Sequence, residues 1–205
     1  MVQKDPGFLN LAGLFLLLGC SQFLVFLIVA SSLYPGYSIS QNYISDLGAT
    51  CRAHSCVVFQ PSSTIFTISV ILLGIMAILS SVMFRRGGGD PYLSIFLFIT
   101  GIGSIGVGIF DETFGSLHTL FAAVTFIFGA AAPIASYRIL KGYIRIIVPT
   151  MGVLAIVFLV LFMARIDLGL GPGGVERLVA YFELIPGIII GSYLATPQRR
   201  HVPAD

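Results

Sequence analysis

The sequence contains no tryptophan and little charge, with 11 Lys or Arg and 9 Asp or Glu among 205 residues. Charged residues make up 10% of the chain, whereas soluble domains contain roughly 25%. Apolar residues make up 57%, which is more than the interior of a soluble domain of this size can absorb. The shortage of charge therefore excludes an ordinary soluble domain and predicts an integral membrane protein. The net charge of +2 gives no indication of nucleic-acid binding.

Several motifs of cofactor and catalytic sites are also missing. The stretch "GIGSIG" lies inside an apolar run with no strand before it, so it does not match a dinucleotide fingerprint. The sequence has no serine-centred nucleophile elbow and no haem attachment motif. We therefore expect no cofactor.

What the sequence does contain is six apolar runs, each long enough to cross a bilayer as a helix. They lack the period of two that a spanning strand requires, and backbone groups in lipid must pair within a helix or a closed barrel. We expect an all-α integral membrane protein, a six-transmembrane-helix bundle forming one domain over residues 1–205. The predicted spans are 8–33, 64–84, 92–110, 117–137, 144–164 and 175–195.

Orientation follows from the Lys and Arg residues that flank the spans, because cytoplasmic loops are enriched in them. The segments on one side contain eight of these residues, namely Lys4, Arg85, Arg86, Arg138, Lys141, Arg145, Arg199 and Arg200. The other side contains Arg52, Arg165 and Arg177. We therefore expect a multi-pass protein of the cell membrane with both termini in the cytoplasm.

The segment between the first two spans is then extracytoplasmic. It reads "YSISQNYISDLGATCRAHSC" over residues 37–56 and is called the polar segment below. We expect it to fold over the bundle, with a short interfacial helix near Asp46. Cys51 and Cys56 are expected to form a disulfide, because thiols oxidise outside the cytoplasm. A zinc site made of Cys51, His54 and Cys56 would lack a fourth ligand, so we expect no metal.

Three motifs resemble a prokaryotic membrane-protein family called domain of unknown function 998. They are "NYISDLG" after the first span, "GIFDETFGSLHT" between the third and fourth spans, and "GPGGVERL" at the last span. The resemblance covers nearly the whole chain and implies six helices, but it implies no known activity. Asp111 and Glu183 depart from the family pattern. The polar positions that it carries over are Asn42, Tyr43, Ser45, Asp46, Glu112, His118, Glu176 and Arg177.

Asp46, Glu112 and His118 are the candidate catalytic residues, and each has a structural alternative. Asp46 could cap a turn, or it could act as a base or hold a cation or head group. Glu112 and His118 flank a loop of five residues. A carboxylate beside a histidine suits acid–base chemistry, but the same pair could be a hydrogen bond that ties the two helices together.

Asn42, Tyr43, Asp46, Glu176, Arg177 and Glu183 are the candidate ligand-binding residues. Glu176 is favoured by the helix dipole in the first turn of the last span, whereas Arg177 is disfavoured there and needs a carboxylate or an anionic ligand. Glu183 lies two turns deeper on the same face. An acid at that depth must face the bundle interior, and it is a functional candidate by default.

Three classes of function stay open. The first is a membrane enzyme or lipid-handling protein whose polar site takes a lipid or polyprenyl-type amphiphile. The second is a non-catalytic accessory subunit with membrane-protein partners, and the third is a proton-coupled carrier that uses Glu183. We expect Asp46, Glu112, His118, Glu176 and Arg177 to converge under the polar segment.

Overall fold

The computed structural model describes residues 5–52 and 55–196. Lys4, His54, Arg199 and Arg200, which entered the sequence-based expectations, lie outside the described residues. Within them, six helices are long and apolar enough to cross a membrane, which confirms the predicted number. They are α1 (Pro6–Leu33), α2 (Ser62–Arg86), α3 (Pro91–Ile109), α4 (Ser116–Ala135), α5 (Ile144–Met163) and α6 (Pro172–Ala195).

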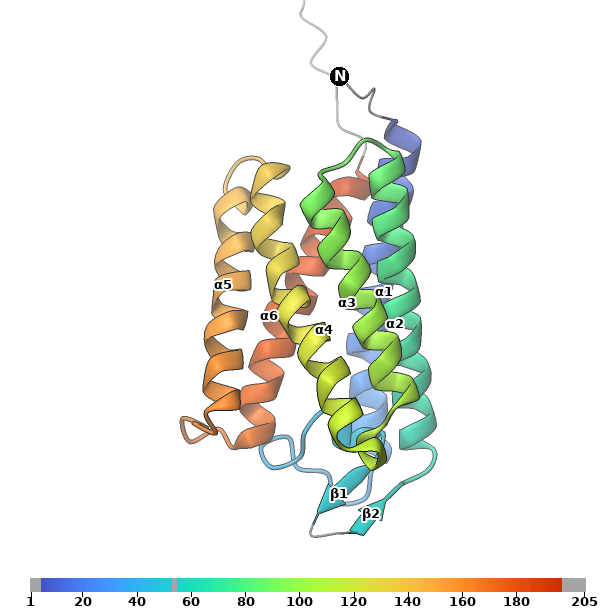
Figure 1. The fold of residues 1–205 in the computed structure, drawn as a ribbon, viewed down its shortest axis with the longest axis vertical. Coiled ribbons are helices and arrows are strands. Elements are labelled where there is room, and N and C mark those ends of the chain that lie inside the picture. The colour runs from blue at the N-terminus through green and yellow to red at the C-terminus, as the bar shows by residue number, and fades with distance from the viewer. Residues whose placement is uncertain (1–4, 53–54, 197–205) are drawn as a thin grey trace, which may run out of the picture.

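The helices form one bundle in which each helix packs against the next along the chain (Figure 1). The last helix, α6, also packs against α1, and α4 also contacts α6. The start of α1 and the end of α6 lie at the same end of the bundle, called the terminal end below. The opposite end carries a two-stranded sheet and is called the hairpin end.

Several helices begin before the apolar runs because capping residues start them. Proline occupies the first turn of α1, α3 and α6, where its missing N–H costs nothing. The carboxylates of Asp5 and Asp90 accept the backbone N–H groups of Gly7 at 2.9 Å and Leu93 at 3.1 Å. These side chains pair N–H groups that have no partner inside the helix.

Close helix packing in the interior depends on small residues. A Cβ on Gly101 of α3 would lie 2.6 Å from the carbonyl oxygen of Gly74 on α2. Because real side chains do not approach that closely, any larger residue would push α2 and α3 apart. This is the small-residue packing that is typical of membrane helices.

The link from α1 to α2 contains the polar segment. Around Asp46, where a short helix was expected, it forms the three-residue 3-10 helix η1 (Ser45–Leu47). It continues into β1 (Thr50–Arg52) and β2 (Ser55–Val57), which pair antiparallel with Cys51 opposite Cys56. The expected disulfide joins these two cysteines. Two further 3-10 turns flank α4, η2 (Glu112–Phe114) and η3 (Ser136–Arg138).

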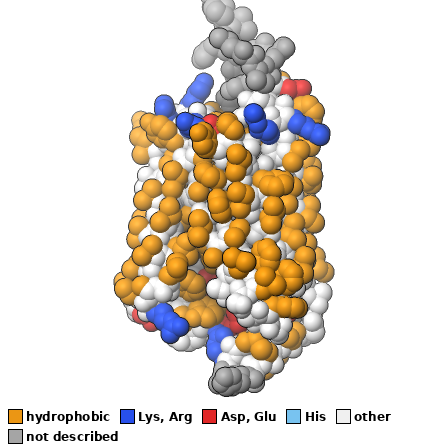
Figure 2. Space-filling view, viewed as in Figure 1, with side chains coloured by type: hydrophobic (Ala, Val, Ile, Leu, Met, Phe, Trp, Pro, Cys, Tyr) orange, Lys and Arg blue, Asp and Glu red, His pale blue; other side chains and the backbone are white. Residues whose placement is uncertain are grey.

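Apolar side chains cover the visible side of the bundle between its two ends (Figure 2). Lys and Arg side chains gather at the terminal end, and acidic and basic side chains appear together at the hairpin end. The polar residues singled out in the sequence therefore lie mainly at one end of the molecule.

Candidate functional site

The polar segment lies against the first turns of α6 at the hairpin end. The backbone N–H of Gly173 donates to the carbonyl oxygen of Ser40 at 2.9 Å. A Cβ on Gly173 would lie 2.8 Å from the carbonyl oxygen of Ile39, which is too close for any side chain. The glycine-rich start of α6 therefore lets the backbone of the polar segment lie directly on the helix.

Arg177 binds the polar segment from the first turns of α6. Its Nη1 donates to three carbonyl oxygens, those of Ile39 and Asn42 at 2.9 Å and that of Gly173 at 2.8 Å. Its Nη2 donates to the hydroxyl of Tyr37, and the guanidinium lies over the Tyr37 ring, 5.3 Å from its centre. Arg177 is only 5% exposed. Among the described residues it forms no ion pair, so backbone carbonyls and one phenol bind it where the sequence implied a carboxylate or an anionic ligand.

Glu176, the residue before Arg177, holds the next part of the polar segment. Its Oε2 accepts the backbone N–H of Ile44 at 2.5 Å, and the residue is 5% exposed. An isolated charge buried at this depth would be costly, so the contact supplies part of the solvation that water would give. Two consecutive residues of α6 thus bind consecutive turns of one loop.

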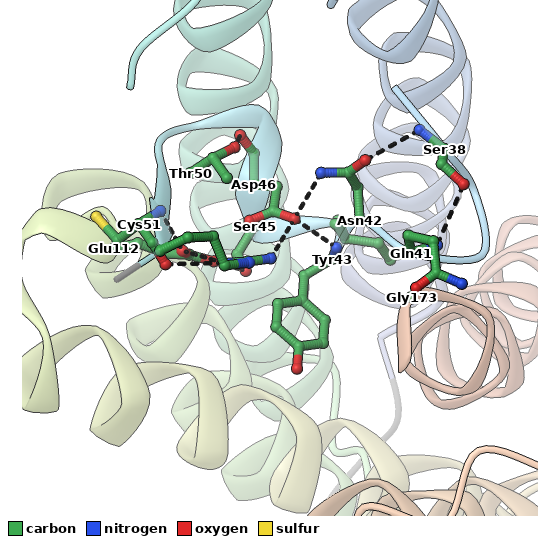
Figure 3. Close-up of polar contacts among 12 residues, drawn as sticks. Ser38, Gln41, Asn42, Tyr43, Ser45, Asp46, Thr50, Cys51, Glu112 and Gly173 are labelled. Carbon is green, nitrogen blue, oxygen red and sulfur yellow. Dashed lines mark hydrogen bonds and ion pairs between the residues drawn. The ribbon is translucent and has the colours of Figure 1, made fainter. Parts of the chain in front are cut away.

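Asp46 organises the polar segment itself (Figure 3). Its Oδ2 accepts from the side-chain amide of Asn42 at 3.0 Å, the backbone N–H of Tyr43 at 2.8 Å and the guanidinium of Arg52 at 2.8 Å. Asp46 is 1% exposed. Its other oxygen, Oδ1, has no hydrogen-bond partner among the described residues. This pattern is that of a turn-forming Asp that is also paired with a cation.

Glu112 joins η2 to the polar segment. Its Oε1 accepts from the hydroxyl of Ser45 at 2.7 Å, and its Oε2 accepts from the backbone N–H of Cys51 at 3.2 Å. The Arg52 guanidinium lies 3.6 Å from Oε2, so Arg52 bridges Asp46 and Glu112. Figure 3 shows Glu112 beside Cys51 and Ser45.

The protonation of Glu112 follows from this setting. Burial raises the pKa of the Glu112 carboxyl above its ordinary value, and the Asp46 carboxylate adds to the rise. The hydrogen bonds from Ser45 and Cys51 and the charge of Arg52 oppose the rise without cancelling it. Glu112 therefore takes up a proton more readily than a carboxyl in water.

His118 does not pair with Glu112 as the sequence spacing had suggested. Its Nδ1 lies 2.7 Å from the carbonyl oxygen of Phe110, at the end of α3. A carbonyl can only accept, so Nδ1 carries the hydrogen and Nε2 of a neutral ring is left as a base. The ring is 8% exposed. The contact ties α4 to the end of α3, and a carbonyl rather than a carboxylate determines the tautomer.

Glu183 lies deeper in the bundle than the other acids and apart from their network. A Cβ on Gly129 of α4 would collide with its carboxylate, so Glu183 points from α6 toward α4, as expected for an interior-facing acid. Its Oε1 is inaccessible and has no hydrogen-bond partner among the described residues.

A cleft of about 340 Å³ opens beside the polar segment, between α4 and the ends of α5 and α6. Its polar lining consists of Ser45, Cys51, Arg52, Glu112, His118, Thr119 and Glu176. Its apolar and aromatic lining includes Tyr43, Ala122, Phe126 and Phe162. Tyr43 and Phe162 meet edge to face, with ring centres 5.7 Å apart. The cleft is therefore amphipathic.

The structure thus brings Asn42, Tyr43, Asp46, Glu112, Glu176 and Arg177 together around the polar segment, with His118 beside them on the cleft. Tyr37 and Arg52 also belong to this network, although neither was among the residues predicted from the sequence. Burial raises the pKa of the Tyr37 hydroxyl to about 12, and the Arg177 charge offsets only part of the rise. Their place inside the dense polar segment was the one available indication.

Comparison with known proteins identifies a family but no named relative. The family described as protein of unknown function (DUF998) matches residues 17–193. Neither the curated proteins nor the solved structures contain a match.

Proposed function

This chain belongs to the family described as protein of unknown function (DUF998), and from its geometry we propose that it is a multi-pass membrane protein that binds an amphiphile. The polar head of the ligand would occupy the cleft beside the polar segment. Its apolar chain would leave between α4 and α5 into the bilayer. The observation that carries this proposal is the mixed lining of the cleft, which combines the polar side chains of Glu112, His118 and Glu176 with the rings of Phe126 and Phe162.

The charge distribution supports an orientation with the cleft outside the cytoplasm. The described Lys and Arg residues of the terminal end are Arg85, Arg86, Arg138, Lys141 and Arg145, whereas those of the hairpin end are Arg52, Arg165 and Arg177. Two of the latter are engaged inside the protein, Arg52 with carboxylates and Arg177 with carbonyls. Basic residues concentrate on the cytoplasmic side of membrane proteins, and disulfides persist outside it. Both termini would then be cytoplasmic, in the cell membrane.

The charges at the cleft favour a cationic, zwitterionic or hydroxyl-rich head over a phosphate alone. Glu112 and Glu176 line the cleft, whereas the guanidinium of Arg177 is committed to the polar segment. Arg52 reaches the cleft but is already paired with two carboxylates. An anion would therefore meet more acid than free base. The volume falls in the range of small-molecule pockets, which begins at about 300 Å³.

Native mass spectrometry of the detergent-extracted protein tests the proposal with a matched pair of variants. Thr119 lines the cleft, and Thr150 lies exposed on α5 with the same kind of hydroxyl contact to the carbonyl four residues earlier. We expect Thr119→Phe to lose a copurified amphiphile that the wild type and Thr150→Phe retain. Equal retention by all three proteins, or no bound amphiphile in the wild type, would overturn the proposal.

One observation favours an alternative, a non-catalytic accessory subunit. Arg177, Asp46 and Glu112 all bind groups of the polar segment: Arg177 binds its carbonyls, Asp46 binds Arg52, and Glu112 binds Ser45, as in a cluster that only locks a loop. In that case the wild type would copurify with a protein subunit and no amphiphile. His118→Ala would then lower thermal stability and change no ligand signal.

A further inference from the structure

Two cavities lie inside the bundle and meet at Glu183. The first, of about 70 Å³, lies under the polar segment and is lined in part by His118, Glu176 and Glu183. The second, of about 60 Å³, lies further along the bundle and is lined in part by Thr100, Gly129 and Glu183. Each is large enough for a few water molecules. The walls that the two share include Ser104, Thr125 and Glu183.

The polar groups of these walls are almost all hydrogen-bond acceptors. The hydroxyls of Ser104 and Thr125 donate to carbonyl oxygens of their own helices at 2.9 Å, those of Thr100 and Phe121. The hydroxyl of Thr100 donates to Phe96 in the same way, and that of Ser45 donates to Glu112. Each of these oxygens therefore presents only lone pairs to the cavities.

The titratable groups of the lining add further acceptors. His118 uses its Nδ1 hydrogen on Phe110, so Nε2 is an acceptor in the neutral form of the ring. Glu176 and Glu183 contribute carboxyl oxygens, and the thiol of Cys20 on α1 contributes a weak donor. Walls of this kind accept a guest that carries hydrogens or positive charge.

Glu183 has no ion pair with a basic side chain among the residues that the structure describes. Arg177 is the nearest basic residue along α6, six positions or about 9 Å away, and its guanidinium is bound to carbonyls of the polar segment and to Tyr37. Around the two cavities, the titratable side chains among the described residues are Cys20, His118, Glu176 and Glu183, and α5 contributes none. An unbalanced carboxylate at this depth is costly, so a positive partner must come from outside.

A route for such a partner leads from the hairpin end. The cleft and the first cavity share the walls formed by Ser45, His118 and Glu176. The first cavity and the second share those at Glu183. Beyond Glu183 the second cavity is lined by apolar side chains that include Leu16, Leu97 and Ile190. The cleft and the two cavities thus share polar residues in succession up to Glu183, while the rest of the first cavity is lined mainly by apolar side chains such as Phe23 and Phe66.

We propose that Glu183 is an internal binding site for a monovalent cation, either a proton delivered by water or Na⁺, that enters from the cleft at the hairpin end. Both candidate species are small, and each either donates a hydrogen bond or carries a positive charge. Both therefore suit a cavity wall whose polar groups are mainly hydrogen-bond acceptors. The site is separate from the amphiphile site of the proposed function, because its walls are too close for a lipid head group. The Glu183 site does not depend on the proposed amphiphile binding, so either proposal can fail without the other.

Infrared difference spectroscopy of the wild type against Glu183→Gln in lipid tests the site directly. If Glu183 binds a proton, the wild type shows the carbonyl band of a neutral carboxylic acid at neutral pH, and the variant loses it. If it binds Na⁺, that band appears without Na⁺ and disappears when Na⁺, but not choline, is added. The proposal is overturned if the wild type shows no neutral-acid band that Glu183→Gln removes and if Na⁺ has no effect on the spectrum.

Exchange into deuterated water tests the route. The neutral-acid band is expected to shift on exchange, because water reaches Glu183 through the first cavity. Ala122 lines both the cleft and the first cavity, so Ala122→Phe is expected to slow that shift. A band that never shifts in the wild type would contradict entry from the cleft.

A second variant keeps the test independent of Glu183→Gln. Thr125→Val removes one acceptor oxygen from the wall without changing the size of the side chain much. It is expected to move the neutral-acid band to higher frequency in the proton case, or to weaken the Na⁺ effect in the other. Thr150→Val, on the exposed face of α5, is the matched control and should leave both unchanged. Identical spectra for the two threonine variants would count against the site.

Discussion

The carboxylate of Glu176 accepts the backbone N–H of Ile44 at 2.5 Å, across 132 positions of the chain. The next residue, Arg177, donates to the carbonyl oxygen of Asn42 at 2.9 Å. Adjacent residues of α6 thus bind the two kinds of backbone group in the polar segment, a carboxyl oxygen accepting an N–H and a guanidinium donating to a carbonyl. This arrangement explains how a loop without much regular structure stays in place over the bundle.

Arg177→Lys is expected to destabilise the protein although it keeps the charge. A lysine cannot reproduce the planar fork that contacts Ile39, Asn42 and Tyr37 together. With hydrogen bonds to a charged group lost in a buried position, we expect a loss on the order of 3 kcal/mol in the free energy of unfolding. Thermal unfolding in detergent measures it. The exposed Arg165→Lys at the same end is the control, and an equal effect of the two changes would contradict this role.

The pH dependence of stability is expected to reflect Glu112. Its raised pKa in the folded protein means that the folded state binds a proton over a range where the unfolded state does not. The free energy of unfolding therefore falls as pH rises from the ordinary Glu pKa, about 4.3, through the higher pKa of the folded state. The stabilising contribution of Glu112 is complete only below the ordinary Glu pKa. Chemical unfolding at a series of pH values checks this, with Glu112→Gln expected to flatten that part of the profile.

The hydrogen bond from Ser45 offers a test of the cause. It lowers the pKa of Glu112, so Ser45→Ala is expected to shift the fall in stability to higher pH. A profile that is the same in wild type, Glu112→Gln and Ser45→Ala would show that another group produces the dependence.

Reduction of the Cys51–Cys56 disulfide is expected to cost about 2 kcal/mol, because the closed loop is short. Reduction should also weaken the hydrogen bond that the backbone N–H of Cys51 donates to Glu112. Alkylation and mass spectrometry before and after reductant, together with the melting temperature, measure both effects. Free thiols on both residues in the untreated protein would refute the expected pairing.

The orientation is tested with single cysteines at the two ends, in a Cys20→Ser background. Lys141→Cys lies at the terminal end and Asp167→Cys at the hairpin end, and both positions are exposed. In intact cells a membrane-impermeant maleimide should label position 167 at once and position 141 only after permeabilisation. The reverse pattern would invert the proposed topology.

Six apolar runs, nearly free of charge, were enough to predict six helices and their order. Helix formation in such segments depends on local hydrogen bonds and on the absence of water, both of which are properties of the run itself. The capping residues Asp5 and Asp90 moved the starts of α1 and α3 by only a few positions. Cys51 and Cys56 likewise pair across a hairpin that is local in sequence.

The partners of the polar residues could not be predicted in this way. Arg177 implied a carboxylate or an anion, yet carbonyls more than 130 positions earlier in the chain bind it. His118 implied Glu112, yet it contacts Phe110, while Glu112 binds Ser45 and Cys51. A sequence determines which groups need a partner, because that need is set by burial and chemistry. Which partner each group finds depends on how distant segments pack, and only the tertiary structure decides that.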